Sequence, residues 1–98
     1  MDCLTDEILT QAIERQVSDI FDSHDMYFTL MTYWAEAYVR ELYEALESHS
    51  DPFEKLHMDI AKRMASQHLN HVVRKHGGKR RSLNCRGKED ENQVWERI

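Results

Sequence analysis

Residues that form turns are scarce in this chain, and this scarcity limits the folds that it can adopt. Its 98 residues include three glycines and one proline. An all-β sandwich or barrel needs a turn signal about every 8–12 residues. The sequence therefore predicts a mainly α fold. The length suits a single domain, residues 1–98, with a modest core.

Two helices are expected in the first half of the chain. The first extends from Asp6 to Phe21, with Thr5 as its N-cap. After a polar break, one long amphipathic helix is expected from Met26 to Glu47. It carries aromatic residues at helical spacing on one face and glutamates elsewhere. These are the aromatic stripe Tyr27, Trp34 and Tyr38, and the acidic row Glu36, Glu41, Glu44 and Glu47.

The second half predicts one more long helix and little regular structure after it. This helix begins at Asp51-Pro52, where a capping residue precedes a proline suited to the first helical position. Its apolar spacing continues to His76, and Gly77-Gly78 is a helix stop. Residues 79–86 predict a short strand or an extended arm. Residues 89–98 predict a short acidic helix, which makes three to four helices in total.

The aromatic stripe has two interpretations. The simpler one places it in the core of the domain. Three helices of this size cover so wide a stripe with difficulty, however, and a homodimer with packed long helices would also bury it.

Charge is separated into blocks along the sequence. The acidic helical part, residues 1–54, has a net charge of -11; the basic helix and glycine-bounded turn, residues 55–88, have +9; and the acidic C-terminal segment, residues 89–98, has -3. Such opposed fields act on partner choice and association rate more than on the fold.

Several classes of protein are disfavoured by the sequence. Cys3 and Cys85 are too few for a disulfide framework, and two reduced thiols are expected. The first residues are acidic and lack the pattern of a signal peptide. The most apolar stretch, 26–46, contains charged residues and is not expected to span a membrane. A cytoplasmic protein without membrane contact is therefore predicted.

Neither catalysis nor a cofactor is expected. Neither cysteine is selected by spacing as part of a nucleophilic trio, and Gly77-Gly78 lacks the context of a phosphate-binding loop. His68 and His71 lie one turn apart, but zinc requires three or four converging ligands. The sequence therefore predicts a protein that is not an enzyme and has no metal site.

Both charged segments are candidates for partner binding. The basic residues could bind phosphates, or they could be a solvated turn; they are Arg74, Lys75, Lys79, Arg80, Arg81 and Arg86. The acidic row could be a solvated surface, or it could imitate the phosphates of nucleic acid. Sequence leaves these alternatives open.

Two stretches together resemble the Gam family of phage host-nuclease inhibitors. The first is Trp34-Ala35-x-x-Tyr38, and the second is the run from His76 to Asn84, followed by Arg86-Gly87 and an acidic segment that ends Glu96-Arg97-Ile98. The match extends over roughly residues 34–98 and needs a one-residue insertion near Cys85. The resemblance implies a mainly helical dimer that binds the host RecBCD exonuclease and mimics DNA in its binding channel.

A rival resemblance is to the dimerisation half of Mor-type phage transcription activators. It rests on the run from Val72 to Gly78, on Arg86-Gly87 and on Val94-Trp95. That family has a helix-turn-helix after this part, and no such motif follows here.

The function expected from the sequence is a phage-type inhibitor of a host DNA-processing enzyme, active in the host cytoplasm. The acidic row would stand in for phosphates, and the basic turn would contact the target or order a dimer. The alternative is a small DNA-binding or regulatory protein that uses residues 74–88. A third hypothesis is a structural module that binds another protein.

Overall fold

The chain folds as an α+β domain with four helices and a three-stranded antiparallel sheet, so the prediction of a mainly α fold is wrong. The computed structural model describes all 98 residues. Along the chain the elements are α1 (Asp6–Glu14), β1 (Ile20–Asp22), α2 (Ser23–Tyr33), α3 (Ala35–Ser48), α4 (Pro52–Met64), β2 (Val73–Leu83) and β3 (Glu89–Arg97).

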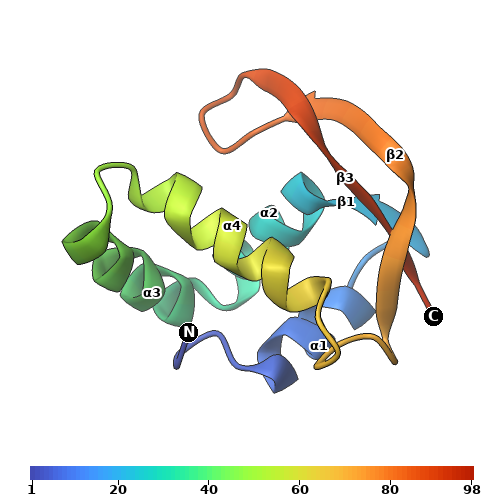
Figure 1. The fold of residues 1–98 in the computed structure, drawn as a ribbon, viewed down its shortest axis with the longest axis horizontal. Coiled ribbons are helices and arrows are strands. Elements are labelled where there is room, and N and C mark those ends of the chain that lie inside the picture. The colour runs from blue at the N-terminus through green and yellow to red at the C-terminus, as the bar shows by residue number, and fades with distance from the viewer.

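The sheet has the order β1-β3-β2, so the last strand of the chain lies between the other two. Strands β2 and β3 form a long hairpin, which bends around one side of the helices (Figure 1). The short β1 pairs with the other edge of β3, where Phe21 lies opposite Trp95. This pairing connects the N-terminal quarter of the chain to its last strand.

The hairpin is irregular at its glycines. Lys75 lies opposite Trp95 and Lys79 opposite Gln93, so β2 has two more residues than β3 between these pairs. Gly77 has a φ of 64°, a conformation that glycine adopts without strain. The predicted helix stop is therefore a bulge inside a strand, which bends the hairpin and increases its twist.

The third predicted helix and the C-terminal helix are corrected by the structure. Helix α4 does begin at Pro52, with Asp51 as its N-cap, but it ends at Met64. The segment expected to complete it, from Val73 onward, is β2, and residues 89–97 are β3. The apolar run of Leu69, Val72 and Val73 is too short to distinguish a helix from a strand. Pairing with β3 decides in favour of the strand from Val73 onward. The strand or arm expected over 79–86 is part of β2 and its turn.

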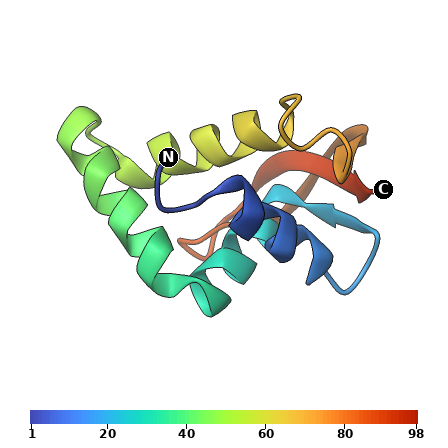
Figure 2. The same ribbon diagram turned by 90° about the horizontal axis from the view of Figure 1, so that it is seen from below.

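The first two predicted helices are also shorter than expected. Helix α1 begins after Thr5, as predicted, but ends at Glu14 instead of Phe21. The long helix is interrupted at Trp34, whose φ of -130° and ψ of 45° are not helical. It is therefore two helices, α2 and α3, and α3 lies at the end of the molecule opposite the base of the hairpin (Figure 2).

The core joins the helices to the sheet. Fifteen buried residues form one cluster to which all four helices and all three strands contribute, among them Ile13, Phe21, Leu30, Ile60 and Trp95. None of the helices is both long enough and apolar enough to cross a membrane.

Replacement of Trp95 by alanine tests the importance of the sheet for stability. Trp95 is 1% exposed, and its indole Nε1–H donates to the Ser23 hydroxyl at 2.8 Å. Loss of its buried surface and of this bond is expected to lower the free energy of unfolding by about 3–5 kcal/mol in urea titrations. Leu83→Ala, at an exposed position of the same hairpin, should change it by less than about 0.5 kcal/mol. Equal effects would contradict the assignment of Trp95 to the core.

Candidate functional site

A buried carboxylate joins β1, α2 and the β2–β3 hairpin. Asp22 is the last residue of β1, the N-cap of α2 and only 1% exposed. It accepts from the Asp25 amide at 2.9 Å, and the Asp25 carboxylate accepts from the Asp22 amide at 3.0 Å. Arg80 of β2 donates to Asp22 at 2.8 Å and to Asp25 at 3.0 Å. The strand, the helix and the hairpin are therefore fixed by one polar group.

The electrostatics of this pair favour the charged forms. Burial raises the pKa of Asp22, but hydrogen bonds from Arg80 and from the Asp25 amide lower it by more, so the net shift is downward. The hydrogen bond to Asp22 likewise raises the pKa of Arg80. We call Asp22, Arg80 and the neighbouring polar residues His24, Ser82, Asp90 and Asn92 the anchor cluster.

His24 lies at the centre of the anchor cluster. Its Nδ1 lies 2.7 Å from the Ser82 hydroxyl, its Nε2 lies 2.9 Å from Asp90, and its amide donates to Asn92 at 3.0 Å. A serine, a histidine and an aspartate in this order are also the components of hydrolase triads. Here the Ser82 oxygen also accepts from Asn92 at 3.1 Å, and Ser82 is not among the residues that line the groove between the hairpin and α4. The arrangement suits a structural connection better than a nucleophile.

A groove of about 570 Å³ lies between the hairpin and the start of α4. Tyr27, Phe53 and His57 line its aromatic part. The charged residues at its border are mixed in sign, with acids in excess; they are Asp51, Glu54, Lys79, Arg86, Asp90 and Glu91. Such a border does not select an anionic small molecule.

Aromatic contacts hold His57 in the wall of this groove. Its ring stacks on Tyr27 with the centroids 3.9 Å apart, and its Nε2 lies 2.6 Å from the Tyr38 hydroxyl. Burial lowers the pKa of His57 to about 4, and the nearby His24 contributes in the same direction. Burial also raises the pKa of Tyr27 to about 12. Both side chains are therefore neutral near pH 7.

The turn of the hairpin contacts the helices at a second place. Arg86 donates to both carboxylate oxygens of Asp51, each at 3.0 Å, and Asp51 is the N-cap of α4. The Arg86 hydrogen bonds hold the pKa of this carboxyl below its usual range. The hairpin is thus connected to α2 through Arg80 and to α4 through Arg86.

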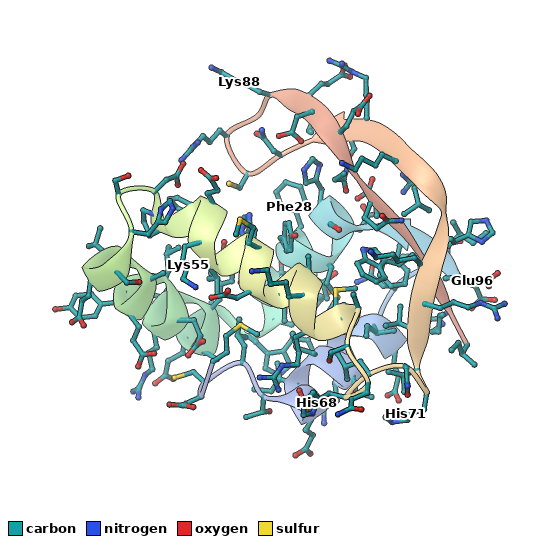
Figure 3. All side chains as sticks on the ribbon, viewed as in Figure 1. Phe28, Lys55, His68, His71, Lys88 and Glu96 are labelled. Atoms are coloured by element: carbon teal, nitrogen blue, oxygen red, sulfur yellow. The ribbon has the colours of Figure 1, made fainter.

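The predicted basic residues all lie on this hairpin and its turn. Arg74 pairs with Glu96 and Arg81 with Glu89, both across the hairpin, while Arg80 and Arg86 make the contacts described above. Lys75, Lys79 and Lys88 are exposed and form no ion pair. Lys88 points away from the helices at the end of the hairpin (Figure 3). The sequence prediction grouped these basic residues but did not identify the carboxylates that pair with Arg74, Arg80, Arg81 and Arg86.

The predicted acidic row is divided by the structure. Glu41 is only 4% exposed, because its side chain accepts from the Cys3 amide at 3.0 Å and so joins the N-terminal segment to α3. Glu36 pairs with Arg40 at 2.8 Å. Glu44 and Glu47 are exposed and form no ion pair. Two of the four carboxylates therefore remain as free surface charges.

The aromatic stripe lies mainly inside the domain. Tyr27 and Tyr38 belong to the core cluster, and Trp34 is partly buried against it. The core interpretation of this stripe thus suffices without a second copy of the chain.

Sequence reasoning missed the anchor cluster. The polar run Asp22-Ser23-His24-Asp25 predicts a break between the first two helices, although a capping aspartate with an acid three residues later is a recognisable helix start. Its partner Arg80 is 58 residues away along the chain, and only the fold brings the two together.

Comparisons with known proteins give no relative from which a role could be transferred. No family model, no curated protein and no solved structure matches this chain significantly. The resemblances to Gam and to Mor therefore stay predictions.

The half-buried His57 predicts how stability depends on pH. Its pKa is about 4 in the folded protein against an ordinary value of 6.5, so the folded state binds this proton less tightly than the unfolded chain does. The free energy of unfolding should fall by roughly 2–3 kcal/mol as the pH drops from 6.5 to 4. His57→Gln should make this dependence shallower, whereas the exposed His71→Gln should not. Superimposable curves of stability against pH for the two variants would refute the role of His57.

Proposed function

We propose that this protein binds nucleic acid through the β2–β3 hairpin. The observation that carries the proposal is the basic surface of that hairpin, where Lys75, Lys79 and Lys88 are exposed and form no ion pair. Three lysines, with Arg74 and Arg81 on the same two-stranded ribbon and its turn, supply the phosphate contacts that dominate affinity for nucleic acid. DNA binding through residues 74–88 is the first alternative that the sequence offers to nuclease inhibition, and the hairpin geometry favours it.

The shape of the hairpin fits this role. A two-stranded β ribbon is narrow enough to enter the major groove of B-form DNA. The bulge at Gly77 bends the ribbon, and the contacts of Arg80 and Arg86 hold it against α2 and α4. A ribbon that is ordered before binding loses less conformational entropy on binding.

The ion pairs of the hairpin do not prevent phosphate binding. Arg74 and Arg81 have side chains that are 67% and 63% exposed, and the side chains of their partners Glu96 and Glu89 are 25% and 64% exposed. Exposed pairs of this kind contribute little to stability, typically about 0–1 kcal/mol. A phosphate can therefore replace a carboxylate at small cost. Arg80 and Arg86 differ. Arg80 bonds the buried Asp22, and Arg86 bonds both oxygens of Asp51 at the cap of α4, so both hold the hairpin in place.

A salt titration with matched variants tests the proposal. Binding of a labelled DNA duplex, followed by fluorescence anisotropy, should weaken steeply as salt rises. The triple variant Lys75→Ala, Lys79→Ala, Lys88→Ala should weaken binding and reduce the slope of log K against log salt by about three. Lys62→Ala, an exposed lysine on α4, is the control and should leave the slope unchanged. Absence of binding at low salt, or equal slopes for all variants, would rule the hairpin out.

Inhibition of a host DNA-processing enzyme is a second proposal. It is favoured by Glu44 and Glu47, two exposed carboxylates on α3 without an ion-pair partner. In this second proposal the protein takes the place of DNA in the binding channel of a RecBCD-like exonuclease. The acidic face of α3 then contacts the site where the DNA phosphates bind. Only two of the four carboxylates of the acidic row are available for this role, because Glu41 is buried and Glu36 is paired with Arg40.

Exonuclease inhibition is measured directly. RecBCD degradation of linear duplex DNA should decrease stoichiometrically as this protein is added, and Glu44→Lys with Glu47→Lys should abolish the effect. Glu14→Lys, at an exposed acid on α1, should inhibit like the unmodified protein. Full nuclease activity at excess protein would eliminate this second proposal.

A further inference from the structure

The outer face of α3 carries an apolar stripe that nothing in the domain covers. Val39, Tyr43 and Leu46 are 58%, 67% and 57% exposed. Their spacing of four and three residues places them in one row along the helix. The row is separate from the aromatic stripe, since Tyr38 faces the core while Val39 faces outward.

The position of α3 leaves this row accessible. Helix α3 lies at one end of the long axis, away from the base of the hairpin, in both views of the fold (Figures 1 and 2). Its inner side packs on α4 and α2 through residues such as Tyr38 and Leu42. A second protein surface can therefore approach its outer side without displacing any element.

We propose that a second copy of this chain covers the row, with the two α3 helices antiparallel about a two-fold axis near Tyr43. Antiparallel pairing about this residue makes the row self-complementary. Tyr43 then lies beside its symmetry mate, and Val39 lies near Leu46 of the second copy. A closed two-fold contact of this kind uses the same surface on both chains.

Charge complementarity at the border of the row supports this occupant over an unrelated protein. Arg40 and Glu47 lie on the same side of the row, seven residues apart. A two-fold axis at Tyr43 puts Arg40 of one copy within one residue, about 1.5 Å along the helix, of the level of Glu47 of the other, and the reverse. Arg40 already pairs with Glu36 four residues before it, and its guanidinium, 67% exposed, has further N–H groups to donate. Glu47 has no partner within its own chain.

The dimer is expected to be reversible. Each copy contributes one helix of 14 residues, so the contact is smaller than the interfaces of obligate dimers. The nucleic-acid surface lies on the hairpin, and the dimer contact leaves it free. The inference therefore does not depend on the proposed nucleic-acid binding. It does use Glu47, so dimerisation would compete with the nuclease contact of the second proposal.

Sedimentation equilibrium of the full chain over a range of concentrations tests the proposal. The protein should pass from monomer to dimer as its concentration rises, and Tyr43→Asp should raise the dissociation constant by about tenfold or more. Tyr33→Ser, at an exposed tyrosine outside α3, is the matched control and should leave it unchanged. Unchanged circular dichroism will show that the variants fold.

A charge exchange tests the antiparallel register itself. Arg40→Glu alone and Glu47→Arg alone should each weaken the dimer, whereas the double variant should restore it, because the exchanged charges meet again across the axis. A monomer at every concentration would overturn the proposal. A dimer that Tyr43→Asp does not weaken would also overturn it. So would a double variant whose dimer is weakened by the sum of the two single effects. A monomer that instead binds a host protein through Tyr43 would assign the row to that protein.

Discussion

The fold depends on one buried carboxylate. Asp22 ends β1, caps α2 and receives Arg80 from β2, and it is 1% exposed. A charge at that depth is tolerated only when its oxygens are paired and hydrogen-bonded, and loss of one partner leaves an uncompensated buried charge. Because β3 lies between β1 and β2, a contact between Asp22 and Arg80 closes the sheet across its central strand. The anchor cluster then adds His24, Ser82, Asp90 and Asn92 to the same connection.

This connection also divides the basic residues by role. Arg80 faces the buried carboxylate, and Arg86 bonds the cap of α4, so both hold the hairpin in place. Lys75, Lys79 and Lys88 form no ion pair within the chain, and they are the residues that we propose to bind phosphate. Their charge serves a second purpose, because β2 is the long free edge of the sheet. Lysines and a bulge on such an edge oppose edge-to-edge aggregation.

Local signals predicted the local features and not the sheet. The cap at Thr5 and the start of α4 at Asp51-Pro52 were confirmed, because side chain and amide are three residues apart. The start of β2 and all of β3 were predicted as helix, because their short apolar runs, such as Val94-Trp95, suit either structure. Their pairing is a tertiary choice made by contact with β1 and α2. Burial of Glu41 was likewise unpredictable, since it requires the Cys3 amide from 38 residues away.

The central claim is that the hairpin, and not α3, is the surface that contacts nucleic acid. Amide chemical shifts of the isotopically labelled protein, recorded while a short DNA duplex is added, test it most directly. The account predicts that the amides of residues 75–88 change first and most, while those of α3 stay unchanged. Changes confined to α3, or none in the hairpin at saturating DNA, would contradict it.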